Sequence, residues 1–536
     1  MATPATNPPR GAILLIVLGG LAQLAFVATQ INTASTKLLI TELLTPPLVA
    51  FALYLLWRTL HRSSDAPSLW TTVQVRLGSG TSLVVVAGGL GYMVATGWLM
   101  TATSYDIWGL FVAAPAMAWI AIRAVQRVLD RDLAVLQRAA LTGLVAKAAG
   151  TAARYWVAND AYGGAADASQ YHETGKELAG QLYDGTRSIV ETIPHTQGTR
   201  FIGELTGLLY SLVGSSRLAA FFWFGLLGYL GVLLMVKAAV LAVPGLAAER
   251  YAWLCFLMPS LVFWPSSIGK EAWLSLTLGA VSLGVARVFG RRARVGIAWI
   301  AAGSVGSAMV RPHMALLGIA GLALAAVVAA FSNRVGDNIR RRRPVVIAIT
   351  LISLAGLTLI GKLTLQFLNP DDDGSASLSN QVTNILDSAT ERTTAAGSSF
   401  EPIKISGPAD YPEAIVRTLT RPLLYEASNI ATLLPALEMT FYVGLCAVSW
   451  RRIARLPKVL LRSPYMVYAL TTLLLFGLGW SSFGNLAILV RQRSLVMPFL
   501  LLLPCLAAPL PAANAPLRMV SPTQMWLQPV RGGPRR

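Results

Sequence analysis

Apolar runs long enough to cross a membrane recur along the whole of this chain. A helix rises about 1.5 Å per residue and the hydrocarbon layer is about 30 Å thick, so one span needs about 20 apolar residues. Of the 536 residues, 54% are hydrophobic and only 13% are charged, whereas about a quarter of the residues in a soluble domain are charged. We therefore predict an all-α, polytopic integral membrane protein.

Hydropathy predicts about fourteen spans. They lie near residues 11–30, 38–57, 82–101, 107–125, 139–157, 217–237, 250–265, 272–289, 295–310, 313–331, 345–366, 428–449, 464–482 and 490–510. The fifth is the weakest, because Lys147 and Arg154 interrupt it, and the last begins with Arg491 and Arg493.

Charge placement predicts how these spans are oriented. Arginines cluster in short segments beside the spans, at residues 123–127, 291–294, 340–343 and 451–455. Such loops are typical of the cytoplasmic side. Alternating spans from a cytoplasmic N-terminus place all four segments inside and two long loops outside. The outer loops hold 16 of the 25 acidic residues but seven of the 44 Lys and Arg. We therefore predict a multi-pass protein of a bacterial plasma membrane, with both termini cytoplasmic.

This topology divides the chain into six parts. They are N-terminal membrane helices over 1–157, an acidic outer loop over 158–216, central helices over 217–366, a second outer loop over 367–427, C-terminal helices over 428–510 and a cytoplasmic Pro/Arg-rich tail over 511–536. The net charge of +19 arises largely from arginines at membrane edges, which interact with anionic headgroups. Nucleic acid is therefore not expected as a partner.

Polar side chains gather at the outer boundary of the predicted spans. They are the acidic segment 167–173, Lys270, Glu271, Arg311, His313, Arg421, Arg491 and Arg493. Charges at membrane depth are costly and persist where they pair, face water or act. Arg and Lys can neutralise a phosphate leaving group, and a carboxylate can accept a hydroxyl proton or hold a divalent metal. The set predicts transfer from a lipid-linked phosphate donor, while interfacial anchoring is the alternative for each single arginine.

The acidic segment and the two that follow it resemble the GT-C superfamily of membrane glycosyltransferases, which includes aminoarabinose transferases and protein O-mannosyltransferases. That family has the pattern Asp-Glu-x-x-Tyr-x-Glu ahead of a helix in its first large outer loop. DASQYHE at 167–173 is similar at Asp167, Tyr171 and Glu173, with Ala168 in place of the second acid. Segments 201–222 and 259–276 are similar in order to later family features.

The last polar segments resemble a different group. RPLLYEASN at 421–429 and NLAILVRQR at 485–493 look like segments of bacterial polysaccharide polymerases. Besides the transferase, the sequence therefore leaves open a polymerase or ligase that joins lipid-linked repeat units. A non-enzymatic lipid or glycan transporter or flippase is the third alternative. It would need paired charges near the bilayer midplane, where the predicted spans hold few acids, chiefly Glu42 and Glu438.

The resemblance implies that Asp167 is the general base or a ligand of a divalent metal, Mg or Mn. We place Glu173 beside it as a second catalytic candidate. Phosphate binding is assigned to Lys270, Arg311, Arg421, Arg491 and Arg493, and substrate binding to Tyr171, His172, Glu271 and His313. Each has a structural alternative: Asp167 can cap a helix, Lys270 and Glu271 can pair with each other, and Glu173 and His172 can be surface residues.

Together these observations predict a glycosyltransferase that acts on the extracytoplasmic face. Its donor would be a polyprenyl-phosphate or polyprenyl-pyrophosphate sugar held among membrane lipid. Its acceptor would be a glycan, lipid or protein of the cell envelope.

Overall fold

The computed structural model of this chain describes residues 81–129, 133–164, 166–290, 292–332, 343–368, 407–427 and 430–507, with residues 381, 388 and 390. Every regular element in these ranges is helical, and they contain no β-strand. The all-α prediction is confirmed for this part of the chain. The predicted spans 11–30 and 38–57, most of the second outer loop and the tail from 511 lie outside the described residues.

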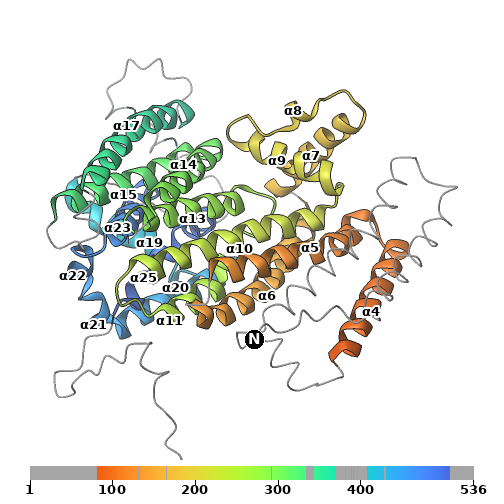
Figure 1. Ribbon diagram of the computed structural model, residues 1–536, viewed down its shortest axis with the longest axis horizontal. Helices are drawn as coiled ribbons and strands as arrows, with labels where there is room; N and C mark the ends of the chain where they lie inside the picture. The colour runs from red at the N-terminus through yellow and green to blue at the C-terminus, as the bar shows by residue number, and fades with distance from the viewer. Residues whose placement is uncertain are drawn as a thin grey trace, which may run out of the picture.

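Figure 1 shows how the helices are arranged. In chain order, those up to residue 263 are α4 (Thr81–Ala102), α5 (Tyr105–Val128), α6 (Ala134–Trp156), the π-helical η3 (Val157–Ala161), α7 (Asp167–Tyr183), α8 (Ile189–Thr192), α9 (Thr199–Val213), α10 (Arg217–Ala242), α11 (Ala248–Leu257) and α12 (Pro259–Phe263). Those that follow are α13 (Lys270–Val288), α14 (Ala293–Val310), α15 (Pro312–Phe331), α17 (Arg343–Leu368), η4 (Pro408–Asp410), α19 (Tyr411–Thr420), η5 (Leu424–Glu426), α20 (Ile430–Val448), α21 (Trp450–Ile453), α22 (Leu456–Leu460), α23 (Pro464–Gly479), α24 (Leu486–Arg493), α25 (Met497–Leu502) and η6 (Leu503–Cys505).

Five of the described helices, α5, α10, α14, α15 and α17, are long and apolar enough to cross a membrane. The number rises to seven if two bent helix pairs each form one span: 432–448 with 450–460, bent by 69°, and 486–493 with 497–505, bent by 64°. These are the helices of a membrane-embedded protein. Within the described ranges they are fewer than the fourteen predicted, partly because α23, with 16 residues, and α11, with 10, are too short to cross alone.

The predicted span 250–265 is not one helix, because α12 begins with a proline that cannot continue α11. Buried side chains satisfy the backbone groups at this break. Lys147 on α6 donates to the carbonyl oxygens of Leu261 and Val262 at 2.9 and 3.3 Å. Glu438 on α20 accepts from the backbone N–H of Ser260 at 2.8 Å. Two polar side chains inside predicted spans thus bind backbone groups at a broken helix, since unpaired backbone groups are costly in an apolar environment.

Helix α10 crosses the centre of the molecule, with α13 on one side and α5 and α6 on the other (Figure 1). Its contact with α13 depends on glycine. A Cβ atom on Gly231 would lie 2.2 Å from the carbonyl oxygen of Ser275, and one on Gly279 would lie 2.4 Å from that of Gly231. The two backbones therefore touch, as small residues permit in membrane helices. This contact holds α13, and with it the residues at its N-terminal end.

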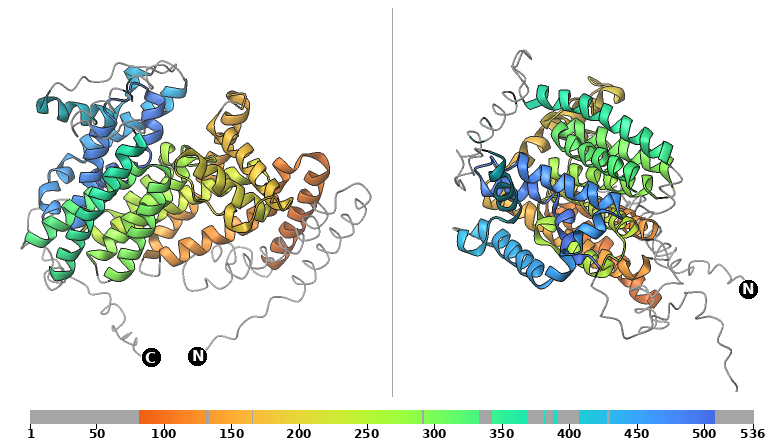
Figure 2. Two further views of the ribbon diagram at one scale, coloured as in Figure 1. Left: turned by 90° about the horizontal axis from the view of Figure 1, so that it is seen from above. Right: turned by 90° about the vertical axis from the view of Figure 1, so that its left-hand side faces the viewer.

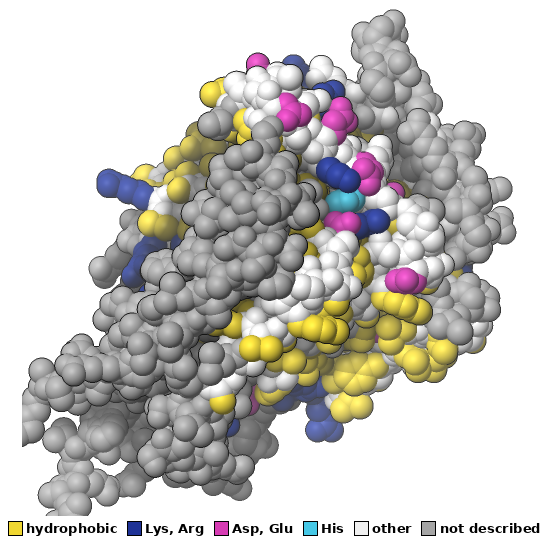
Figure 3. All heavy atoms as spheres, turned by 90° about the vertical axis from the view of Figure 1, so that its right-hand side faces the viewer, with side chains coloured by type: hydrophobic (Ala, Val, Ile, Leu, Met, Phe, Trp, Pro, Cys, Tyr) yellow, Lys and Arg dark blue, Asp and Glu magenta, His cyan; other side chains and the backbone are white. Residues whose placement is uncertain are grey.

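The first predicted outer loop is itself helical. Helices α7 and α9 pack together where Gly175 meets Thr206 and Gly207 meets Leu178. Figure 2 places the α7–α9 group and α19 at the same end of the long helices. On the face drawn in Figure 3, acidic and basic side chains and a histidine gather in one area, beside an area of hydrophobic side chains.

Candidate active site

Asp167, the first residue of α7, contacts a helix near the other end of the chain. The N-cap of α7 is Ala166, and no side chain caps this helix. Asp167 therefore does not have the helix-capping role that was its structural alternative. Its carboxylate Oδ2 instead lies 3.0 Å from Nη1 of Arg491 on α24. With 60% of its side chain exposed, Asp167 offers a second carboxylate oxygen to an incoming molecule.

The same arginine also holds a buried carboxylate. Glu271, the second residue of α13, is only 1% exposed, and its Oε1 lies 2.8 Å from Nε of Arg491. Nη2 of Arg311 lies 3.5 Å from this oxygen. Burial raises the pKa of Glu271, but the charges of Arg491 and Arg311 and the hydrogen bond from Arg491 lower it by more, so the pKa is about 2. Glu271 is therefore ionised at any physiological pH.

Gln492 completes the contacts. Its side-chain N–H donates to Glu271 at 3.3 Å, and its oxygen accepts from Arg311. We call Asp167, Glu271, Arg311, Arg491 and Gln492 the Arg491 cluster. These residues come from α7, α13, the turn between α14 and α15, and α24. The sequence-predicted alternative in which Lys270 and Glu271 form a local pair is not what the structure shows.

Two further cations lie beside the Arg491 cluster. Arg154 interacts electrostatically with Arg491, Glu271 and Asp167. Its guanidinium lies 5.2 and 5.1 Å from the ring centroids of Phe263 and Trp264, and its buried Nε has no hydrogen-bond partner.

Lys270 donates from Nζ to the hydroxyl of Thr199 at 2.8 Å. Burial, and then the charge of Arg311, lowers the pKa of Lys270. Four cations (Arg154, Lys270, Arg311 and Arg491) thus surround two carboxylates. The excess positive charge suits an anion such as a phosphate.

The remaining residues of the acidic segment are divided between this cluster and another contact. Tyr171 is buried and interacts electrostatically with Asp167, and burial raises its pKa. His172 lies in a different contact, with its Nδ1 2.6 Å from the hydroxyl of Tyr210. Burial lowers the pKa of His172. Glu173 is 71% exposed and lies 3.9 Å from His172, so the contacts of Glu173 and His172 are separate from those of the Arg491 cluster.

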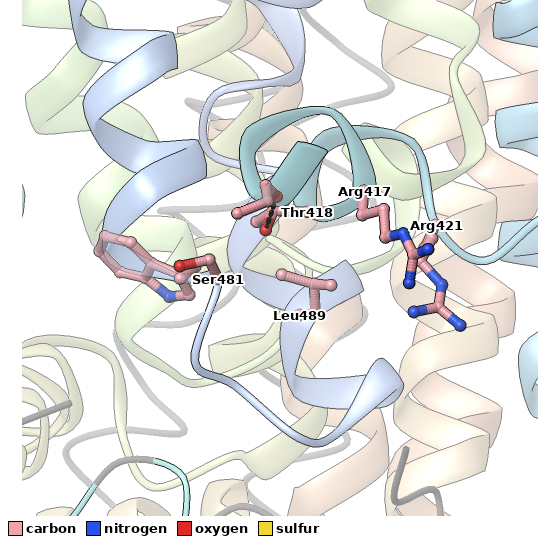
Figure 4. A pocket seen from close by; sticks show the side chains of 7 residues that line it. Arg417, Thr418, Arg421, Ser481 and Leu489 are labelled. Carbon is pink, nitrogen blue, oxygen red and sulfur yellow. Dashed lines mark hydrogen bonds between the residues drawn. The ribbon is translucent and has the colours of Figure 1, made fainter. Parts of the chain in front are cut away.

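Arg421 and Arg493 form a separate group. Arg421 pairs with Glu426, and Arg493 donates to the backbone carbonyl of Arg421. Arg493 is 1% exposed, which leaves little of it open to a substrate. Arg421 lines a small pocket together with Arg417, Thr418, Ser481 and other residues. Figure 4 shows the guanidinium groups of Arg417 and Arg421 on one side of it and Ser481 on the other. Thus Arg421 and Arg493 do not join the Arg491 cluster.

His313 lies among aromatic rings. Its ring centroid is 5.5 Å from that of Trp480 and 6.4 Å from that of Phe367. Its Nδ1 is buried and has no hydrogen-bond partner. The His313 ring is thus packed against aromatic rings and partly buried, and the substrate contact predicted for it stays a prediction.

Among the described residues, no three His, Cys, Asp or Glu side chains lie close enough together to hold a metal ion. Asp167 and Glu271 are each paired with arginine, and of the two only the Asp167 side chain is exposed. That Asp167 holds Mg²⁺ or Mn²⁺ stays a prediction. In the reaction proposed below, arginine and lysine supply the positive charge opposite the phosphate.

Two members of this region were not singled out from the sequence as site residues. Arg154 carried a usable signal, because a charge inside a predicted span is costly unless it has a role. Gln492 lies between two arginines and carried no such signal.

Comparison of the chain with protein-family models, with curated proteins and with solved structures finds no match in any of the three.

Proposed function

We propose that this protein is a membrane glycosyltransferase that takes a sugar from a polyprenyl-phosphate or polyprenyl-pyrophosphate donor on the extracytoplasmic face. The acceptor is a hydroxyl of a cell-envelope glycan, lipid or protein. One observation carries the proposal: an exposed carboxylate, Asp167, is held by Arg491 in a cluster with excess positive charge. This combination provides a base for the acceptor and counter-charges for the phosphate.

In the proposed reaction, the acceptor oxygen attacks the anomeric carbon of the sugar and forms the new glycosidic bond. Its proton passes to Asp167. The bond between the anomeric carbon and the phosphate oxygen breaks, and the electron pair stays on the phosphate. A positioned base and electrostatic stabilisation of the leaving group both lower the barrier.

Arg491 links proton transfer to phosphate binding, because it forms an ion pair with Asp167. A donor phosphate competes for the same guanidinium, and Arg311, Lys270 and Arg154 add positive charge nearby. As the phosphate takes up Arg491, Asp167 is released and its carboxylate is free to accept the proton of the acceptor hydroxyl. Donor binding would thus prepare the base, and Glu271 would keep Arg491 and Arg311 in place.

The test is the Asp167→Asn variant, which keeps the shape of the side chain but removes its basicity. We expect transfer from a synthetic polyprenyl-phosphate sugar to fall by about 100-fold or more, in the range of a general base, with unchanged membrane abundance. Glu177→Gln is the matched control, since Glu177 is an exposed acid on the same helix. Undiminished transfer by Asp167→Asn would overturn the proposal.

Deletion of the gene in cells separates the transferase from a polymerase. Loss of a polymerase would leave single lipid-linked repeat units, whereas loss of a transferase would leave an unmodified acceptor. We expect the unmodified acceptor.

A further inference from the structure

A second cationic pocket lies at the opposite end of the helices that build the Arg491 cluster. It is lined by Arg127 on α5, Lys237 on α10, Arg287 on α13, and Arg292 and Trp299 at the start of α14, among others. Glu271 and Arg287 lie 16 residues apart on α13, a separation of about 24 Å at 1.5 Å per residue. The two sites are thus separated by most of the thickness of a bilayer.

The pocket has the size and the charge of a ligand site. Its volume is about 490 Å³, within the range of about 300 to 1,000 Å³ that small-molecule sites occupy. Of the described residues that line it, four are basic and none is acidic. Within the described ranges, no carboxylate forms an ion pair with Arg127, Arg287 or Arg292. Arg287 and Arg292 repel each other, so an anion placed between them would be stabilised.

The rest of the pocket wall is apolar. Leu234 on α10 and Leu283 on α13 line it about one turn closer to the middle of their helices than Lys237 and Arg287, and Leu241 lines it at the end of α10. The guanidinium of Arg287 lies 5.5 Å from the centroid of the Trp299 ring, which orients it. Arg127 and Arg292 are exposed. A pocket that combines basic side chains with leucine side chains suits a molecule that has a phosphate headgroup and a hydrocarbon tail.

We propose that this pocket binds the phosphate headgroup of an anionic membrane lipid, with its acyl chains against the leucines. Free phosphate has the same headgroup chemistry but would gain nothing from the apolar wall. Basic pockets between membrane helices on the positively charged side are known to hold such headgroups. The site lies apart from the Arg491 cluster and is independent of the proposed transfer reaction.

The experiment is native mass spectrometry of the full chain in detergent, titrated with phosphatidylglycerol or phosphatidylcholine. We expect the double variant Arg287→Gln/Arg292→Gln to bind phosphatidylglycerol at least about tenfold more weakly, since each basic contact near a membrane contributes roughly fivefold. The matched control is Arg123→Gln/Arg294→Gln, which removes two arginines from α5 and α14 that do not line the pocket. Equal binding by the double variant and the wild type, or equal loss in the control, would overturn the proposal.

One measurement on the wild-type protein alone tests the proposal even if the double variant does not fold. Phosphatidylglycerol should bind at least about tenfold more tightly than phosphatidylcholine, again from the basic contacts, and equal binding contradicts the proposal. Calorimetric titration with inorganic phosphate alone should show no saturable binding that the double variant Arg287→Gln/Arg292→Gln loses, so that phosphate bound at the Arg491 cluster is not counted. Saturable binding as tight as that of the lipid, and lost in the double variant, would show that the pocket takes free phosphate and would overturn the lipid assignment.

Discussion

Glu271 shows how a carboxylate can be kept buried and charged. Two arginines and an amide surround it, and the positive charges of the arginines stabilise its ionised form over its neutral form. Removal of one member of a buried ion pair leaves the others without a counter-charge, and this costs more than the pair itself contributes. The exposed pair of Arg417 and Glu413, whose side chains are 51% and 58% exposed, is the opposite case, because water screens it.

We predict that Glu271→Gln lowers the free energy of unfolding by on the order of 3 kcal/mol, while Glu413→Gln changes it little. The reason is that the first variant leaves Arg311 and Arg491 without a carboxylate. Thermal unfolding of both variants in the same detergent measures the difference. Equal stability of the two variants would show that Glu271 does not hold the site together.

The pH dependence of this difference follows from the lowered pKa of Glu271, about 2. A carboxylate with a lowered pKa in the folded state stabilises the fold above its ordinary pKa of about 4.3. This contribution is lost as the pH falls from there toward 2. The stability gap between wild type and Glu271→Gln should therefore be constant from pH 8 to about pH 5 and shrink below about pH 4. A gap that already closes near pH 6 would be inconsistent with this ion pair.

At the level of helices, the contact between α10 and α13 positions one end of the site. We predict that Gly231→Leu destabilises the protein strongly, because any side chain there meets the backbone of Ser275. Gly444→Leu on α20 is the control, since a Cβ atom there has nothing within 4 Å. Size-exclusion chromatography and thermal unfolding should show loss of folded protein for Gly231→Leu alone. Normal folding of that variant would mean that the two helices are not in backbone contact.

Hydropathy predicted where most of the described helices lie but not where they break. The predicted span 313–331 corresponds to α15, and 345–366 to α17, because each is a continuous apolar run. The span predicted at 490–510 is instead a bent pair. Its first half, α24, contacts distant parts of the chain, including Glu271 through Arg491. A hydropathy window averages over such local contacts and cannot detect them.

The candidate site could be predicted only in part for the same reason. The predicted topology places Asp167, Arg311 and Arg491 at one membrane boundary, and the structure brings them into one region. Arg421 and Arg493 share that boundary too, yet they contact each other instead. Which charges pair depends on how helices distant in sequence pack. A single sequence contains no pattern for a contact such as that between Asp167 and Arg491, which are 324 residues apart.

For the whole molecule, the account requires α7 to face outside the cell and α22 to face the cytoplasm. We predict that Glu177→Cys reacts in intact cells with a membrane-impermeant maleimide, and that Lys458→Cys reacts only after the membrane is opened. Both positions are exposed. The native protein, whose three cysteines are buried or half-buried, gives the background. Labelling of Lys458→Cys in intact cells would reverse the predicted orientation.

The most direct test of the proposed site is a structure of the protein in a lipid nanodisc with a polyprenyl phosphate bound. We predict that the phosphate lies within hydrogen-bonding distance of Arg491, beside Arg311 and Lys270. We also predict that Arg491 no longer pairs with Asp167. A phosphate bound instead at Arg421, with the ion pair of Asp167 and Arg491 intact, would contradict it.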